Sequence, residues 1–445
     1  MPVQHIGKGT SAVADPAQIA HLLRRTEYVA RPDRVTALSL GTLSAAVDDV
    51  LNFAVTPVAL PAFIDHSIDG QGWEQYVVAA KWWLDRMVDS PKPLQEKMAF
   101  FWHGHFTSSW WKVGDTWAMT KQNKLYRDNA VGSFYTLTQA MAVEPAMLLY
   151  LDNAQNTKGS PNENFARELM ELFTLGVGNY TESDVEAAAR AWTGYGINWT
   201  TYAYEYHLAS HDTSNKTFFG TTKAWTGPQI IDEILLNNAA KALTTARRIV
   251  TKLWEYFAHQ NPPTAVVDAL APAFAADWQV KPLLKAIFLR SEFYLPAATQ
   301  GLVRSPIDWV VALMYHTGFR SDAINPQWYV EGMGQVPFDP PNVAGWKSNA
   351  SWVNTSTFGA RAEFARGVTW HLRQNDGFAN LADMTIADAV DSVTAFFGIA
   401  PVSTVTRTAM TNFLTAQRAA APWGDWWEPT NLLSMAMLAP EMHVA

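Results

Sequence analysis

The sequence of 445 residues contains no cysteine. This absence excludes disulfide bonds, thiol nucleophiles, and sites in which cysteine binds zinc or an iron–sulfur cluster. A divalent metal ion would therefore have to be bound by histidine, carboxylate or other oxygen and amide ligands. Because a chain without cysteine tolerates both oxidising and reducing surroundings, the composition leaves the cellular compartment open.

Charged residues are also scarce, at 17% of the chain, and the formal net charge is −8. Because no block of basic residues occurs, we expect no nucleic-acid partner. No apolar run reaches the roughly 18–20 residues of a membrane span, and residues 1–16 lack the apolar centre of a signal peptide. We therefore expect no membrane span and a cytoplasmic protein. A place in the cell envelope is the alternative, if the protein is exported with a partner or the sequence is trimmed.

Hydrophobic residues are abundant, at 48%, and include 20 tryptophans, which suit both a core and platforms for flat ligands such as sugar rings. Segments with helical spacing of apolar residues recur throughout, for example the one that starts with Asp15 as N-cap and Pro16. Thr181 and Asp184 form a capping-box pattern at another helix start. No linker or repeat divides the chain. We predict a mainly α fold: one large multi-helix domain over residues 1–445, with a small β-hairpin and long ordered loops.

The β-hairpin is predicted within residues 196–220. Tyr202, Tyr204 and Tyr206 alternate with other residues at the period of a β-strand. Residues 216–220 are the candidate return strand, and the polar, turn-rich segment between them is the candidate connection.

A second irregular segment, residues 332–357, is rich in proline, glycine, asparagine and tryptophan. Long loops in compact proteins are usually functional or disordered. The three large aromatic residues Phe338, Trp346 and Trp352 favour an ordered loop that packs on the body of the protein. We take Trp346 and Trp352 as candidate substrate contacts.

Polar residues are concentrated after Ser160, where Ser160 is the predicted N-cap and Glu163 completes a capping box. On a continuous helix, Glu163, Arg167 and Glu171 share one face, and Glu168 lies beside Glu171. One interpretation is a solvent-exposed face with ion pairs worth a few tenths of a kcal/mol each. The other is a functional site in which clustered carboxylates have perturbed pKa values.

Two histidines, His103 and His105, stand two residues apart in the aromatic segment 101–111. On a continuous helix they would point to nearly opposite sides, whereas an extended chain would place them on one face. Because Gly104 weakens the helix, we expect both histidines at or just beyond its end, where they could bind a metal ion with further ligands. Alternatively, one histidine caps the helix and the other packs under neighbouring aromatics. The further ligands by residue type are Glu168, Glu171 and His211.

His211 and Asp212 form a histidine–aspartate step at the tip of the predicted hairpin. Such a pair can act as a general base if the carboxylate orients the imidazole. Adjacent residues rarely bond in this way, so an Asx-turn at Asp212 is the alternative. The motifs GxSxG, Walker A, GxGxxG and HExxH are absent, which disfavours the α/β-hydrolase, NTPase, Rossmann and zincin classes.

Several segments are specific enough to indicate a family: HLLRRTEY, EKMAFFWHGHFTSS, PNENFARELMELFTLGVGNYTESD, HDTSNKTFFG and FDPPNVAGW. From about His21 to the last third of the chain, the sequence resembles the bacterial domain of unknown function 1800 family. The resemblance implies a sulfatase-like protein partner and an envelope role, but no defined activity. The recurrent polar positions of the family match His103, His105, Arg127, Asp152, Asn153, Asn162, Glu163, Asn164, Arg167, Glu168, Glu171, His211 and Asp212.

Two functional hypotheses follow. The first is a metal-assisted or acid–base hydrolase that acts on a carbohydrate-like polymer or conjugate. The second is a non-catalytic binding or scaffold protein, in which the loop 332–357 contacts a sulfatase-like envelope partner. For the hydrolase, the expected catalytic residues are Arg167, Glu168, Glu171, His211 and Asp212; the substrate contacts are Arg127, Asp152, Asn153, Asn164, Trp346 and Trp352; and the ligands of a divalent metal are His103 and His105.

Overall fold

Helices α1 (Pro16–Thr26) and α11 (Glu182–Ala191) begin where the sequence predicts. The Asp15 carboxylate accepts a hydrogen bond from the Ala17 N–H at 2.9 Å, and Pro16 occupies the first turn. At α11, Thr181 and Asp184 cap each other in a capping box. Both predictions are confirmed, because a cap depends on residues only a few positions away.

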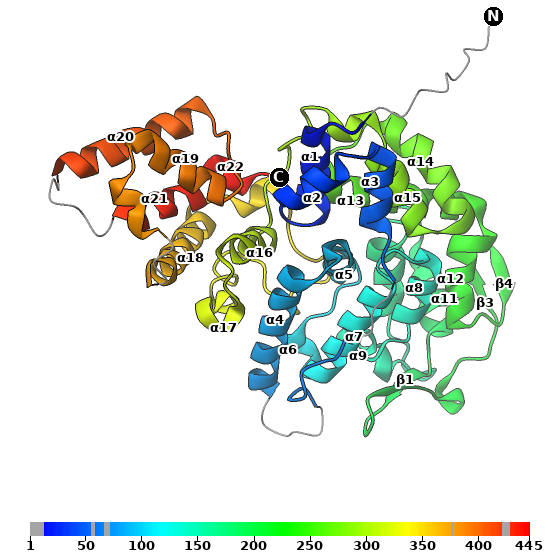
Figure 1. Cartoon of the computed structure of the whole chain (residues 1–445). Helices are drawn as coiled ribbons and strands as arrows, with labels where there is room; N and C mark the ends of the chain where they lie inside the picture. The colour runs from blue at the N-terminus through cyan, green and yellow to red at the C-terminus, as the bar shows by residue number, and fades with distance from the viewer. Residues whose placement is uncertain (1–12, 55–57, 66–71, 375–377, 421–427) are drawn as a thin grey trace, which may run out of the picture.

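The computed structural model describes residues 13–54, 58–65, 72–374, 378–420 and 428–445. Helices dominate these residues, and they pack around one large hydrophobic core, so the predicted mainly α fold is confirmed (Figure 1). Within the described residues, no helix has both the length and the apolar character needed to cross a membrane.

The N-terminal helices surround α5, which is buried along almost its whole length and packs against α4 and α7. Because α5 is central, even polar side chains such as Glu96, Lys97 and His105 are buried. The helices after α1 are α2 (Pro32–Leu38), α3 (Leu43–Leu51), α4 (Gly72–Asp89), α5 (Pro93–His105), α6 (Trp110–Val113), α7 (Thr116–Asp128), α8 (Phe134–Met141) and α9 (Pro145–Tyr150).

The middle of the chain is organised around α13, a long amphipathic helix that packs closely on α14. Its apolar stripe faces the core, which leaves its polar residues at the edges of the packed surface. The helices here are α10 (Asn164–Glu168), α11, α12 (Gly227–Asp232), α13 (Ala239–Phe257), α14 (Thr264–Asp277) and α15 (Val280–Phe288).

The C-terminal helices form the part of the molecule at the left of Figure 1, and the chain then returns to the middle, beside α1. This return is fixed by backbone hydrogen bonds from Arg304 N–H to His443 O and from Ala445 N–H to Leu302 O. The helices are α16 (Pro306–Thr317), α17 (Ser321–Ile324), α18 (Thr355–Gln374), α19 (Ile386–Phe396), α20 (Thr404–Ala420), α21 (Glu428–Met437) and α22 (Pro440–His443).

The described strands form two separate antiparallel pairs, so the pairing predicted for the hairpin is wrong. Strand β2 (Ala203–Tyr206) pairs with β1 (Tyr195–Asn198), which precedes it. Residues 216–220 do not return to β2; instead β3 (Lys216–Phe218) pairs with β4 (Thr221–Lys223). The tyrosine alternation indicated a strand correctly, but periodicity alone does not identify the partner of a strand.

The helix predicted from Ser160 is shorter than expected and starts later. Helix α10 begins at Asn164, and its first N–H is capped by the side-chain oxygen of Asn162 at 2.9 Å rather than by Ser160. The predicted capping box of Ser160 and Glu163 is therefore wrong. After Glu168 the chain widens into a π-helical turn, η2 (Leu169–Phe173), so the predicted continuous helix is also wrong.

The loop 332–357 packs on the body of the molecule, as predicted. Phe338 is 1% exposed and Trp352 is 5% exposed, and the Trp346 ring stacks on Phe100 of α5 with ring centres 4.8 Å apart. The remaining short helical turns are η1 (Asn153–Gln155), η3 (Leu208–Ser210), η4 (Glu233–Asn237), η5 (Ser291–Tyr294), η6 (Pro326–Trp328), η7 (Asn349–Trp352) and η8 (Ala379–Asp383).

Candidate functional site

The two histidines of the aromatic segment lie in the last turn of α5, which ends at His105, so the expectation that they stand at its end is confirmed. Gly104 does not end the helix. A Cβ added at Gly104 would lie 3.5 Å from the Trp346 ring, which is an ordinary van der Waals distance. Gly345 has a positive φ of +83°, and a Cβ there would meet the Gly104 carbonyl oxygen at 2.3 Å. Gly345 thus allows the loop 332–357 to press against α5.

His103 is enclosed by aromatic rings and is 1% exposed. Its ring lies near Trp83, Tyr126 and Trp346, and neither of its nitrogens has a hydrogen-bond partner among the described residues. Burial lowers the pKa of His103 to about 3, so the ring is neutral at physiological pH.

His105 has different surroundings, because residues two positions apart on a helix face different ways. Its Nε2 lies 3.1 Å from the Phe173 carbonyl oxygen and its Nδ1 lies 3.0 Å from the Lys252 Nζ. Burial, with Lys252 and Arg248, lowers the pKa of His105 well below its ordinary value. Within the described residues, no group of three or more histidine, aspartate or glutamate side chains is arranged to hold a metal ion.

The charged residues around α10 form ion pairs at the surface. Arg167 donates to both carboxylate oxygens of Glu182, at 2.9 and 2.7 Å, and to Glu163 at 2.9 Å. Glu171 accepts a hydrogen bond from the Tyr180 hydroxyl at 2.5 Å. Glu168 is half-buried, and its burial and the nearby Glu171 raise its pKa. Glu163, Arg167 and Glu171 are therefore paired, and Glu168 is the predicted side chain whose pKa is raised.

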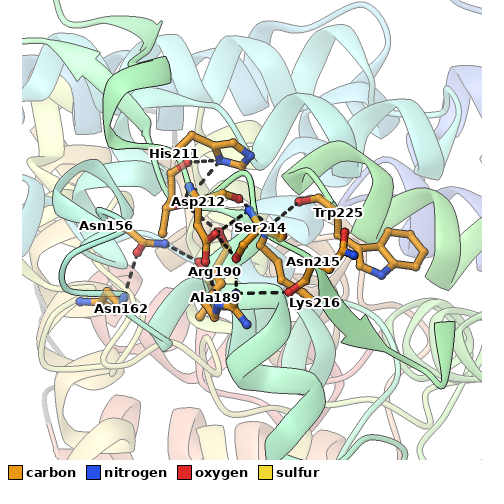
Figure 2. A network of polar contacts seen from close by, with 11 residues as sticks. Asn156, Asn162, Ala189, Arg190, His211, Asp212, Ser214, Asn215, Lys216 and Trp225 are labelled. Carbon is orange, nitrogen blue, oxygen red and sulfur yellow. Dashed lines mark hydrogen bonds and ion pairs between the residues drawn. The ribbon is translucent and has the colours of Figure 1, made fainter. Parts of the chain in front are cut away.

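His211 and Asp212 lie in one polar network but do not form a dyad (Figure 2). The His211 Nδ1 is 2.8 Å from the Thr193 carbonyl oxygen, while Asp212 accepts hydrogen bonds from Arg190 at 2.7 Å and from the Ser214 N–H at 2.9 Å. Burial opposes ionisation of Asp212, but the bonds from Ser214 and Arg190 hold its pKa at about 2. The bond from the Ser214 N–H forms the Asx-turn that is the alternative to a dyad. The bond from Arg190 holds the segment before β3 against α11.

Arg127 lies in the core and is 1% exposed. Its Nε and Nη2 donate to the two carboxylate oxygens of Glu96, at 2.6 and 2.8 Å, and Nη2 also donates to Asn123. The guanidinium is thus held in a bidentate buried ion pair.

Asp152, Asn153 and Asn164 shape the turn that precedes α10. Asp152 accepts hydrogen bonds from Lys112 at 2.8 Å and from Asn164 at 3.1 Å. Asn153 is 1% exposed and donates to the carbonyl oxygens of Trp192 and Tyr195. These hydrogen bonds from Asn153 fix the backbone around β1.

A cavity of about 250 Å³ lies between α1, α5, α13, the start of α16 and the loop 332–357. His105, Trp346 and Trp352 are the sequence-predicted residues that line it. Two acidic residues, Glu255 and Asp308, face six basic residues there, although the whole chain is acidic. We call this site the cationic cavity; its basic residues are Arg24, Arg25, Lys97, Lys252, Arg304 and Lys347.

The basic residues of the cationic cavity are only partly neutralised. Lys97 pairs with Asp308 at 3.0 Å. Arg25 donates to the carbonyl oxygens of Ala258 and Ala298, which are neutral acceptors. Arg304 is 6% exposed, and among the described residues no carboxylate pairs with it.

Burial lowers the pKa of Arg25 to about 9. The Asp308 carboxylate acts to raise this pKa, whereas the charges of Arg24 and Arg304 lower it further. Burial and Arg24 likewise lower the pKa of Arg304 to about 10. The Nε atoms of all three arginines are buried without a hydrogen-bond partner among the described residues. Among the described residues that line the site, cations are therefore crowded together and outnumber the carboxylates.

An aromatic wall completes the cavity. Phe100 and Trp346 are stacked nearly parallel, with an angle of 9° between their planes, and Tyr256 and Trp352 line the same space. Such surfaces suit a flat or apolar part of a ligand. The basic residues of the cavity escaped sequence reasoning because they are scattered between positions 24 and 347, and no local motif unites them.

The model of the family described as protein of unknown function DUF1800 matches residues 21–444. The chain belongs to the DUF1800 family. No curated protein and no solved structure matches the chain. The DUF1800 match includes the six basic residues and the aromatic wall of the cationic cavity, so the site lies within the family domain.

Proposed function

We propose that this protein binds an anionic ligand in the cationic cavity, with a phosphate, sulfate or carboxylate group near Arg304 and a flat or apolar part against the aromatic wall. The supporting observation is the excess of buried positive charge. Arg25 and Arg304 are 3% and 6% exposed. Asp308, the carboxylate that raises the pKa of Arg304, is already paired with Lys97. A buried ion without a partner costs several kcal/mol, and a bound anion would offset that cost.

The residue types favour oxyanions as the ligand group. A guanidinium presents several N–H donors in one plane, which match two oxygens of a phosphate, sulfate or carboxylate. The pocket gathers three arginines and three lysines, whereas the chain as a whole has a net charge of −8. The local positive potential therefore comes from the fold rather than from the overall composition.

The test compares thermal unfolding in phosphate or sulfate with unfolding in chloride at equal ionic strength. A ligand that binds only the folded state raises the melting temperature in a saturable way. We expect this rise in the unmodified protein and its loss in Arg304→Met. Lys158→Met is the matched control, because it removes one positive charge from an exposed side chain. An equal rise in all three proteins would overturn the proposal, because it would reflect a general salt effect.

A second candidate is the hydrolase predicted from the sequence, with Glu168 as the general acid. The observation that favours it is the raised pKa of the half-buried Glu168 carboxyl, which burial and Glu171 cause. Screening against polysaccharides and their sulfated or phosphorylated conjugates tests this function. We expect Glu168→Gln to remove any hydrolysis that the screen detects and Glu163→Gln to preserve it. Equal activity of both variants would refute the role of Glu168.

A further inference from the structure

We propose that Lys252 is a nucleophilic amine that forms an imine with an aldehyde or ketone bound in the cationic cavity. The Lys252 Nζ lies 3.0 Å from the His105 Nδ1, and both residues line the cavity. This inference rests on the proposed function in one respect: the anionic group of the carbonyl compound is held by the arginines of the same cavity.

The hydrogen bonds of His105 determine which atom donates to which. The Phe173 carbonyl oxygen can only accept, so the His105 Nε2, at 3.1 Å, carries the hydrogen. The His105 Nδ1 then has a free lone pair and accepts an N–H from Lys252. His105 is therefore a positioning residue that holds the amine. The π-helical turn η2 supplies the Phe173 carbonyl, and such turns are frequent at functional sites.

The half-buried Lys252 differs from Lys97, a buried lysine of the cavity, in its partner. Lys97 forms an ion pair with Asp308 at 3.0 Å, and that carboxylate stabilises the charged ammonium. Within the part of the chain that the structure describes, no carboxylate forms an ion pair with Lys252. Burial and Arg248 lower the pKa of Lys252 to about 7, although Glu255 opposes this effect. The neutral His105 acceptor thus gives Lys252 no carboxylate partner of the kind that holds Lys97 as an ammonium, and such surroundings favour the neutral amine of a nucleophilic lysine.

The reaction is balanced without any oxidant or reductant. The Nζ lone pair forms a C–N bond to the carbonyl carbon as the C–O π bond breaks, and a proton from Nζ passes to the oxygen. The resulting carbinolamine loses its hydroxyl group and the second Nζ proton as water, which leaves a C=N bond. The arginines and lysines of the cavity would hold the anionic substituent while the aromatic wall contacts the rest of the compound.

Pyridoxal 5′-phosphate is a suitable probe, because it combines an aldehyde, a flat ring and a phosphate. The protein is incubated with one equivalent near neutral pH, reduced with borohydride, and mapped by peptide mass spectrometry. We expect labelling of Lys252 about tenfold or more above that of the exposed Lys158. Lys252→Arg replaces the amine by a guanidinium, which does not form an imine under these conditions, and should lose this label. His105→Gln should slow the labelling of Lys252 while leaving that of Lys158 unchanged, and circular dichroism verifies that each variant is folded.

Pyridoxine 5′-phosphate, which has the same ring and phosphate but no aldehyde, separates the two proposals. If it binds and Lys252 is labelled, both proposals are supported. If it binds but labelling follows side-chain exposure alone, the imine proposal is overturned and anion binding stands. If Lys252 is labelled without measurable binding of pyridoxine 5′-phosphate, the imine proposal stands and anion binding is overturned. Failure of both measurements overturns both proposals.

Discussion

Arg127 and Arg304 are both buried arginines, but their surroundings differ. Arg127 has a bidentate partner in Glu96, with N–O distances of 2.6 and 2.8 Å. Arg304 is surrounded by Arg24, Arg25 and Arg361, and Asp308 is the acidic group that offsets their charges. In the first arrangement the Glu96 carboxylate contacts Arg127 directly, and it also pairs with the partly exposed Arg86 at 2.6 Å. In the second, no carboxylate among the described residues pairs with Arg304, which is the physical reason to expect a ligand there and none at Arg127.

The difference shows that burial and charge together do not identify a functional site. The family pattern drew attention to Arg127 as a substrate contact, yet its guanidinium is already occupied by Glu96 and Asn123. What distinguishes the cationic cavity is the mismatch between cations and anions, and this mismatch is visible only when distant segments are brought together.

The largest expected effect comes from breaking the matched pair. Glu96→Gln keeps the shape of the side chain but leaves Arg127 as an uncompensated buried cation. We expect a loss of about 3–5 kcal/mol in the free energy of unfolding, measured by urea denaturation. A loss well below this range would contradict the matched-pair interpretation of Arg127.

His103 provides a smaller effect, because a buried group without a partner avoids charge by losing its proton. Its folded-state pKa of about 3 lies below the unfolded value of 6.5, so the unfolded chain binds more protons as the pH falls below 6.5. Stability is therefore lost as pH decreases through this range. When the pH is lowered from about 7 to about 5, we expect the free energy of unfolding of His103→Met to fall by about 2 kcal/mol less than that of the unmodified protein. Identical pH dependence in urea unfolding would show that His103 does not titrate in this way.

The mismatched cavity should respond to mutation in the opposite direction from the matched pair. Without added phosphate or sulfate, Arg304→Met removes one of several crowded cations, so we expect the protein to be unchanged or more stable by about 1–2 kcal/mol. Urea unfolding in a chloride buffer measures this change. A loss comparable to that of Glu96→Gln would mean that Arg304 has a stabilising partner.

The smallest effect is expected at the surface. Arg167 pairs with Glu163 and Glu182 at exposed positions, and exposed ion pairs contribute little because solvent screens them. We expect Arg167→Met to leave the urea midpoint nearly unchanged. A clear decrease in the urea midpoint would contradict this expectation, because it would mean that the ion pairs of Arg167 stabilise the fold.

Local sequence features gave reliable predictions where the determining contacts are local. Asp15 caps α1 through the nearest N–H groups, and the aromatic residues of 332–357 pack the loop as expected. The start of α10 was mispredicted because Asn162 competes with Ser160 for the capping role. The pairing of β2 was mispredicted because period-2 alternation does not specify a partner.

The candidate site was the hardest part to predict. Lys252 and His105 are 147 residues apart in the sequence. Arg24 lies on α1, whereas Arg304 precedes α16, so no spacing rule connects these residues. The sequence predicts His105 as a metal ligand beside Glu168, Glu171 or His211, whereas the structure places the Lys252 Nζ 3.0 Å from its Nδ1. Only the tertiary fold reveals this pairing.

The central claim is that the cationic cavity binds an oxyanion attached to a flat group. Isothermal titration of phenyl phosphate into the unmodified protein and Arg304→Met, at constant ionic strength, tests it most directly. We predict one binding site in the unmodified protein and binding weaker by about tenfold or more in Arg304→Met, because a charge-assisted contact is lost. Equal affinity in the two proteins, or no binding to either, would contradict the account.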